Sequence, residues 1–323
     1  MVAGSATVAR MCAVSEASRG RPAGGSSVAS GNGMLAPAKG QAAAECQRQP
    51  QAKAGDRPVG CSPPLRRGVV RSLSLAGTWL RVPAVATLPF LASAAVAATP
   101  LWVGRFDGSA GGLPAGWKIE HLNPRFAATE YRQRVWDGVA AIEATAVKSM
   151  ALLARPLTVD LESTPVLCWR WRIDAPLLTA DLDSKAGDDY AARVYLSFSV
   201  PPAALGLATR SKLALARSLW GATVPDAAIN YVWDNKHPIG TLQASAYTDR
   251  AQLLVIESGA GRAGRWVSER QDVAGDFRRA FGDLPAKLTG LAIASDTDNT
   301  GESARAGFAD FHFVARDGAC AFP

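Results

Sequence analysis

Arginines at alternate positions mark one segment that could bind an anionic or hydroxyl-rich ligand. Residues 167–173 read LCWRWRI, and side chains alternate between the two faces of a strand. This alternation places Trp169 and Trp171 on the core face and Arg170 and Arg172 on the opposite face. A guanidinium is a planar group with several donors, so both arginines could hold a carboxylate or a pair of hydroxyls.

A second segment extends the pattern. Residues 192–198 read ARVYLSF, and the same alternation places Arg193 and Tyr195 on the outer face. If the two strands pair in register, Arg170, Arg172 and Arg193 form a cationic shelf. In the alternative interpretation, each arginine pairs with an Asp on a neighbouring strand across a solvated sheet face.

The segment INYVWD at 229–234 adds an aromatic and an acidic side chain to this surface. Trp233 comes at the end of the predicted strand, where its ring could form an exposed platform for a sugar, and Asp234 follows it. The predicted ligand-binding residues are Arg170, Arg172, Arg193, Tyr195, Trp233 and Asp234.

An acidic stretch near the C-terminus, IASDTDNTGE at 293–302, resembles part of a calcium loop. Asp296, Asp298 and Gly301 match the first, third and sixth positions of an EF-hand, but the twelfth position is Gly307 where a Glu is required. An EF-hand is therefore excluded. A shallower Ca²⁺ site at Asp296, Asp298 and Asn299 is one hypothesis, and a turn held by bonds from side chains to the backbone is the other.

Motifs of the common catalytic classes are missing from the sequence. The chain has three histidines and no GxSxG motif, and the spacing of its His and Cys residues does not predict a zinc site. Acidic residues such as Asp188, Asp189 and Glu269 could serve a hydrolase or a lyase, but no spacing relates one to another. Catalytic residues therefore stay unassigned.

The charge of the chain belongs to its first hundred residues. The formal net charge is +7, and residues 1–97 hold 11 basic residues against Glu16, Glu45 and Asp56, which leaves 24 basic and 25 acidic residues in the remainder. A basic protein would suggest nucleic acid as a partner, but the remainder is close to neutral. We therefore expect no nucleic-acid partner.

The first hundred residues divide into two segments. Residues 1–65 are rich in Ala, Gly, Ser, Gln and Pro, which predicts disorder and indicates a gene-model extension. Residues 66–97 run from arginines through an apolar stretch to small residues, the order of a secretory signal peptide. Arg81, Pro83 and Pro89 interrupt the stretch, so we expect cleavage, no membrane span after it, and a periplasmic or secreted domain at 98–323. An oxidising compartment permits a disulfide between Cys168 and Cys320, which the sequence alone leaves open.

Strand patterns dominate this domain and must position the residues above. Eight segments read as strands, namely 139–146, 165–174, 190–200, 229–234, 252–258, 265–273, 288–296 and 306–315. Helical spacing occurs only at 209–221 and 272–283. The pattern predicts a mostly β fold, a two-sheet antiparallel sandwich of jelly-roll type with one or two short helical insertions.

Several blocks together resemble a known family. WRWRID, GDDYAARVY, INYVWDN, RWVSERQDV, DFRRAFGD, and ASDTDNTG followed by GFADFHF occur in the order found in the bacterial domain-of-unknown-function family 3047. The resemblance covers about residues 101–315. It implies an exported bacterial protein, and it supplies no catalytic residues.

The residues and the resemblance together favour a non-catalytic protein that binds a saccharide or other polar ligand on a sheet face. A carbohydrate-active enzyme, either a polysaccharide lyase or a hydrolase, is the second hypothesis. A structural protein of the cell envelope is the third. Apart from the Ca²⁺ hypothesis, no cofactor is expected.

Overall fold

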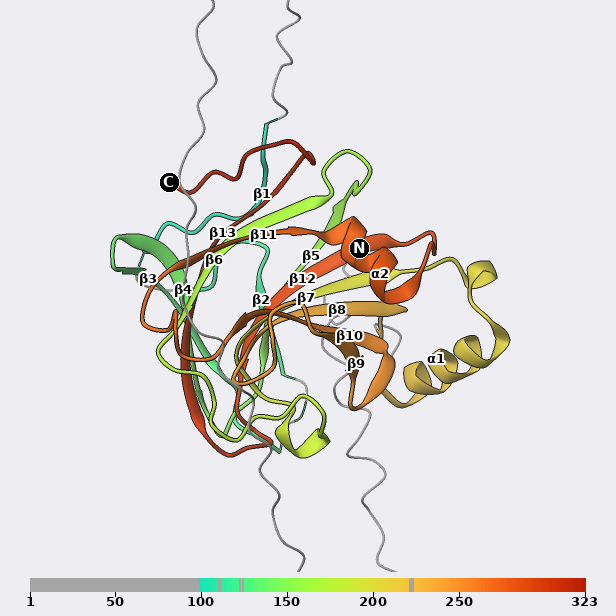
Figure 1. The fold of residues 1–323 in the computed structure, drawn as a ribbon, viewed down its shortest axis with the longest axis horizontal. Coiled ribbons are helices and arrows are strands. Elements are labelled where there is room, and N and C mark those ends of the chain that lie inside the picture. Colours follow the sequence, from blue (N-terminus) through green and yellow to red (C-terminus); the bar gives the residue numbers. More distant parts are fainter. Residues whose placement is uncertain (1–98, 110–111, 122, 124, 221–223) are drawn as a thin grey trace, which may run out of the picture. The chain divides into compact units, whose positions relative to one another are not determined.

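Thirteen strands of the described chain form two sheets that pack face to face in the computed structural model (Figure 1). The structure describes residues 99–323, apart from 110–111, 122, 124 and 221–223. The predicted disordered segment 1–65 and the predicted signal peptide 66–97 lie outside the described residues.

The six-stranded sheet has the order β11-β6-β13-β4-β3, and β1 also pairs with β13. Its strands are β1 (Leu101–Gly104), β3 (Glu130–Trp136), β4 (Val139–Val147), β6 (Val166–Ile173), β11 (Val267–Asp272) and β13 (Ser303–Val314). Every pairing in this sheet is antiparallel.

The seven-stranded sheet has the order β2-β5-β12-β7-β8-β10-β9. Its strands are β2 (Lys118–Glu120), β5 (Leu152–Val159), β7 (Tyr190–Ser199), β8 (Ala227–Asp234), β9 (Leu242–Ser245), β10 (Thr248–Ser258) and β12 (Lys287–Asp296). β8 and β10 are parallel, and the other pairs are antiparallel. Parallel neighbours need a return connection, which residues 235–247 provide with β9 inside it.

The core lies between the inner faces of the two sheets. Trp169 and Trp171 of β6 are both fully buried, as alternation predicts. The Trp169 ring stacks on Tyr231 of β8, with centroids 5.5 Å apart, and the Trp171 ring lies 5.6 Å from that of Trp233. Large aromatic rings from both sheets therefore join the two layers.

Two α-helices interrupt the strand series, as predicted. They are α1 (Leu207–Trp220) and α2 (Val273–Phe281), and short 3₁₀ turns occur at Lys185–Gly187 and Pro202–Ala204. Asp272 caps α2 through a 3.0 Å bond from Gly275 N, and Gly282 ends the helix with φ +75°.

A disulfide joins Cys168 of β6 to Cys320 in the C-terminal tail. The tail then follows the outer face of the six-stranded sheet, where Ala321 N donates to His312 Nε2 at 2.9 Å. The bond closes a loop of 152 residues, so it removes many conformations from the unfolded chain.

The predicted two-sheet sandwich is confirmed, with one departure. The pattern predicts antiparallel strands, and the β8 and β10 pair is parallel. Within the described part of the chain, we find no helix of the length and hydropathy that a membrane span requires.

Candidate functional site

The two arginines of β6 lie in ion pairs on the outer face of the six-stranded sheet. Arg170 bonds the carboxylate of Asp310, and Arg172 bonds that of Asp137. The Arg172 guanidinium also lies over the Trp136 ring, 4.1 Å from its centroid. The same face carries a second network, in which Glu143 pairs with Arg132, Arg134 and Arg305. For these residues the interpretation as arginine–acid pairs across a sheet face is the one observed.

The predicted shelf of three arginines is wrong, because Arg193 belongs to the other sheet. β6 lies in the six-stranded sheet and β7 in the seven-stranded sheet, so the two strands do not pair. Residues 174–189 carry the chain from one sheet to the other. The outer faces of the two sheets point away from each other, which separates Arg170 and Arg172 from Arg193.

Arg193 is the centre of a buried cluster on the outer face of the seven-stranded sheet. Its Nη1 donates to Asp296 Oδ2 at 2.6 Å, and only 1% of the residue is exposed. The guanidinium carbon lies 4.7 Å from the centroid of the Tyr190 ring and 4.5 Å from that of Tyr195. These residues and the buried Asp188 are referred to below as the Arg193 cluster.

Acidic groups outnumber basic ones around Arg193. Burial raises the pKa of Asp188 to about 6; Arg193 acts in the opposite direction, and the charge of Asp189 adds to the rise. Burial also raises the pKa of Asp296, against the effect of Arg193. The pKa of Asp188 therefore lies closer to neutral pH than that of an ordinary carboxyl.

Three polar atoms in or beside the Arg193 cluster have no hydrogen-bond partner among the described residues. They are Asp188 Oδ1, Tyr190 OH and Asn230 Oδ1, all on buried residues. The first two groups are neighbours, because the Tyr190 side chain lies close enough to Asp188 to lower the pKa of that carboxyl. Asn230 lies directly opposite Tyr195 in the register of β7 and β8. Buried polar groups nearly always have partners, so each of these atoms needs an explanation.

The predicted calcium residues are partly used by other contacts. Both carboxylate oxygens of Asp296 accept bonds, one from Tyr190 N at 3.1 Å and one from Arg193. Asn299 donates to Asp189 Oδ1 at 3.2 Å and accepts from the Tyr247 hydroxyl at 3.2 Å. Calcium at Asp296, Asp298 and Asn299 would compete with these bonds, and it stays a prediction.

Trp233 is not an exposed platform, so that part of the predicted surface is wrong. Only 1% of the residue is exposed, and its Nε1 donates to Gly259 O at 3.0 Å. Alternation along β8 explains the error, because Tyr231 and Trp233 share the inner face. Asp234 lies on the other face, where it is also buried.

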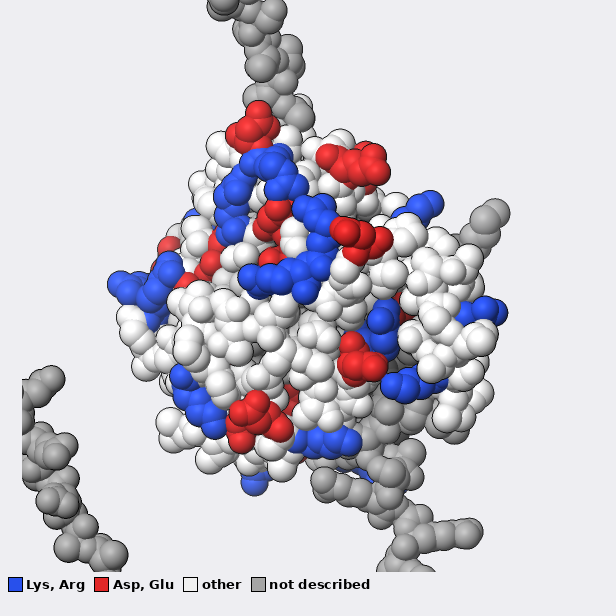
Figure 2. Space-filling model, turned by 45° about the vertical axis from the view of Figure 1, so that its right-hand side comes forward, with Lys and Arg blue, Asp and Glu red and all other residues white. Residues whose placement is uncertain are grey.

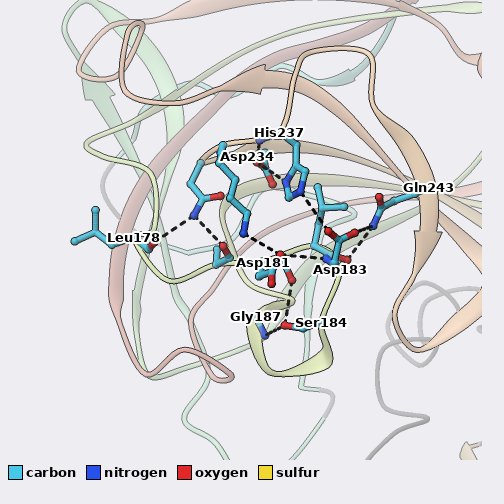
Figure 3. Close-up of polar contacts among 12 residues, drawn as sticks. Leu178, Asp181, Asp183, Ser184, Gly187, Asp234, His237 and Gln243 are labelled. Carbon is cyan, nitrogen blue, oxygen red and sulfur yellow. Dashed lines mark hydrogen bonds and ion pairs between the residues drawn. The ribbon is translucent and has the colours of Figure 1, made fainter. Parts of the chain in front are cut away.

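Asp234 orients a histidine in the loop that follows β8 (Figure 3). Its Oδ1 accepts bonds from Lys236 N at 2.7 Å and His237 N at 2.6 Å, and it lies 3.1 Å from His237 Nδ1. The other ring nitrogen, Nε2, lies 3.6 Å from Asp183 Oδ2. With Asp181, these residues are referred to below as the His237 cluster.

The two clusters are neighbours at one end of the seven-stranded sheet. The charge of Asp234 contributes to the raised pKa of Tyr190, which places the two groups within electrostatic range. The side chains of Lys236 and Asp183 are 53% and 66% exposed. The His237 cluster is thus the exposed side of a surface whose buried side is the Arg193 cluster.

Basic and acidic side chains are interspersed on the face drawn in Figure 2. In its upper part, blue groups form a nearly closed ring around red ones, and elsewhere blue and red groups are scattered among uncharged areas. The picture agrees with the nearly balanced charge of residues 98–323.

Sequence reasoning missed the His237 cluster. The spacing of Asp234 and His237 and the Asp181-Leu-Asp183 pattern are present in the sequence, but residues in different loops can be related only through the fold. A second group, formed by Cys168, His312 and Cys320, has metal-ligand residue types. Its two cysteines form the disulfide, so their thiolates are not available to a metal.

A family model described as "Protein of unknown function (DUF3047)" matches residues 115–312. No curated protein matches the chain in a corresponding comparison.

Several solved structures resemble the chain at low identity. Endoglucanase 3 of family GH12 from Trichoderma harzianum is 9% identical, with 65% of this chain and 96% of that chain covered and a TM-score of 0.33. Endoglucanase cel12A from Rhodothermus marinus is 13% identical, with 68% and 99% covered and a TM-score of 0.35. The xyloglucanase domain of NopAA from Sinorhizobium fredii, in complex with cellobiose, is 10% identical, with 68% and 100% covered and a TM-score of 0.31. Likeness at this level carries no argument about activity.

Proposed function

The chain belongs to the DUF3047 family, whose function is unknown, so the family gives no activity that could be assigned to it. From the site alone, we propose that it is an exported protein that binds a saccharide or a similar polar ligand. The ligand would lie on the outer face of the seven-stranded sheet, at the Arg193 cluster. The predicted signal peptide at 66–97 is the basis for the export part of this proposal.

The observation that carries the proposal is the difference between the two outer faces. On the six-stranded sheet, Arg170 and Arg172 bond acidic side chains, and the disulfide fastens the tail over that face. One atom there, Arg172 Nε, has no partner among the described residues. On the seven-stranded sheet, polar atoms of Asp188, Tyr190 and Asn230 have no partner among the described residues. A ligand with several hydroxyl groups would supply donors and acceptors to all three.

The fixed geometry of Arg193 favours recognition on this face. Its contacts with Asp296 and with the Tyr190 and Tyr195 rings hold the guanidinium in one orientation, so little side-chain entropy is lost when a ligand binds. Alanines at 292 and 294 lie opposite Tyr195 and Arg193 in the register with β12. All four residues are at most 2% exposed, so they belong to the buried side of this surface.

A saccharide panel tests the proposal through the melting temperature of the protein, followed by titration calorimetry for any sugar that raises it. Asn230→Ala should weaken binding by about fivefold, because one hydrogen bond is worth about 1 kcal/mol. Arg132→Ala, on the outer face of the other sheet, should leave affinity unchanged and serves as the control. Equal losses in both variants would contradict the placement of the site. If no saccharide or other polar ligand raises the melting temperature, the structural envelope protein becomes the better hypothesis.

A carbohydrate-active enzyme is the second candidate, and the Asp188 carboxyl favours it. A pKa of about 6 lets this group donate or accept a proton near neutral pH, which lyases and hydrolases both require. Depolymerisation of a bacterial polysaccharide that is lost in Asp188→Asn, with ligand affinity retained, would establish this candidate. Binding without depolymerisation would favour the non-catalytic protein.

A further inference from the structure

The His237 cluster brings together three side chains that can bind a metal ion. Asp181 and Asp183 come from the loop between β6 and β7, and His237 comes from the loop after β8 (Figure 3). Their ligand atoms all lie within 4.8 Å of one another. One ion can therefore contact all three without a large movement of either loop.

The orientation of the His237 ring points to a cation. Asp234 lies against Nδ1 and bonds the backbone N–H of the same residue, which fixes the ring and favours the tautomer with its proton on Nδ1. In that tautomer Nε2 carries a lone pair, and it faces Asp183 Oδ2 at 3.6 Å. Two electron pairs that face each other repel, so a metal ion between them, or a proton on Nε2, would stabilise this arrangement.

The charge balance of the cluster supports the same conclusion. Asp181, Asp183 and Asp234 are three carboxylates, and among the described residues Lys236 is the single ammonium in contact with them, 3.0 Å from Asp181 Oδ1. Asp234 is 1% exposed, and its Oδ2 has no hydrogen-bond partner among the described residues. A buried carboxylate with one unpartnered oxygen, beside two further carboxylates, leaves a deficit of positive charge that a dication would fill.

Asp183 is held in position by a further contact. Gln243 Nε2 donates to Asp183 Oδ1 at 3.0 Å and to Leu182 O at 3.1 Å. Asp183 Oδ1 is thereby occupied, and Oδ2 stays directed toward His237. Outer contacts of this kind orient the ligands of many metal sites.

We propose that Asp181, Asp183 and His237 Nε2 bind a transition-metal dication of the Zn²⁺ class, with Asp234 as the group that orients the histidine. Imidazole together with carboxylates suits Zn²⁺ better than Ca²⁺, which prefers oxygen ligands alone. Three protein ligands leave a fourth position for water or a polar ligand. Lys236 is the internal competitor for Asp181, so it must move away when the metal binds.

Titration of the tag-free full-length protein with Co²⁺, followed by visible absorption and by competition with Zn²⁺, tests the site. We expect one Co²⁺ per chain, displaced by Zn²⁺ and unaffected by an equal concentration of Ca²⁺. His237→Gln and Asp183→Asn should each weaken binding at least tenfold, and Asp234→Asn should weaken it about tenfold. Lys236→Met should tighten binding, an effect that a merely structural loop would not give.

Asp249→Asn is the matched control, because this carboxylate is exposed and pairs only with Lys212 among the contacts of the described chain. It should bind Co²⁺ as the parent protein does. The proposal is overturned if the parent protein binds no Co²⁺, or if it binds equally well after His237→Gln and Asp183→Asn. A protonated His237 would then supply the positive charge. Since none of these readouts uses a saccharide, the metal proposal and the ligand proposal can fail separately.

Discussion

Arg193 and Asp296 form a buried ion pair between neighbouring strands, with Nη1 2.6 Å from Oδ2 and both side chains at most 3% exposed. The two residues lie 103 positions apart in the sequence, on β7 and β12. Their pairing joins the beginning of one strand to the end of the next strand in the sheet, under the turn that the acidic stretch forms.

Asp296→Asn should lower the free energy of unfolding by about 3 kcal/mol, because it removes the carboxylate that the buried Arg193 bonds directly. Urea unfolding at pH 7 measures the change. The control is Asp249→Asn, whose exposed pair with Lys212 should contribute less than about 1 kcal/mol. Similar losses in the two variants would contradict a special role for the buried pair.

Glu269 should make stability depend on pH. Burial and the charge of Glu257 raise its pKa from 4.5 to about 8 in the folded protein, while Trp171 Nε1 donates to it at 3.0 Å. Between these two pH values the folded state holds more protons than the unfolded state, so stability falls as pH rises, and the loss is complete above pH 8.

Glu269→Gln should therefore be more stable than the parent protein at pH 8, by an amount on the order of 2 kcal/mol, and should show a weaker fall between pH 5 and pH 8. Urea unfolding at both pH values provides the measurement. Glu162→Gln, at an exposed position, should follow the parent curve. Parallel pH curves for Glu269→Gln and the parent would show that Glu269 is ionised in the folded protein.

The disulfide between Cys168 and Cys320 should contribute about 4 kcal/mol to stability, because it closes a loop of 152 residues. Reduction should lower the melting temperature of the parent protein. The same reductant should have no effect on the variant in which both cysteines are replaced by alanine. If the oxidised and reduced proteins melt at the same temperature, the tail does not stabilise the sheet beneath it.

Gly307→Ala should lower the free energy of unfolding by about 1 to 3 kcal/mol through overpacking. A Cβ at this position would lie 2.8 Å from Trp266 and 3.0 Å from Arg172. Gly261→Ala is the matched control, since a Cβ there meets nothing within 4 Å, and it should change stability by less than about 0.5 kcal/mol. Equal stabilities of the two variants would mean that the side chains of Trp266 and Arg172 move aside for a Cβ at residue 307 without cost.

Local patterns in the sequence predicted the layers of the fold. Strict alternation in LCWRWRI identified Trp169 and Trp171 as core residues, and helical spacing at 272–283 located α2. Both signals depend only on neighbouring residues, so they are readable without the fold.

Sheet assignment was beyond these patterns. β6 and β7 follow each other in sequence, but 16 residues separate them, a length that suits a crossing between sheets better than a hairpin. A connection of this length predicts that the two strands lie in different sheets, which places Arg193 apart from Arg170 and Arg172. The His237 cluster could not be predicted from local patterns. Asp181, Asp183 and His237 come together only when two loops are placed over the same end of the sheet.

The parallel pairing of β8 with β10 has a consequence for experiments on this protein. Strands that run in the same direction need a return path, and the length of that path does not set their register, unlike the length of a hairpin turn. The path at 235–247 can therefore accept a fluorescent label without disturbing the sheet, and Ile239, which is 62% exposed, offers a position for it two residues from His237. A dye at Ile239→Cys would convert the crossover into an optical reporter of whatever binds beside it.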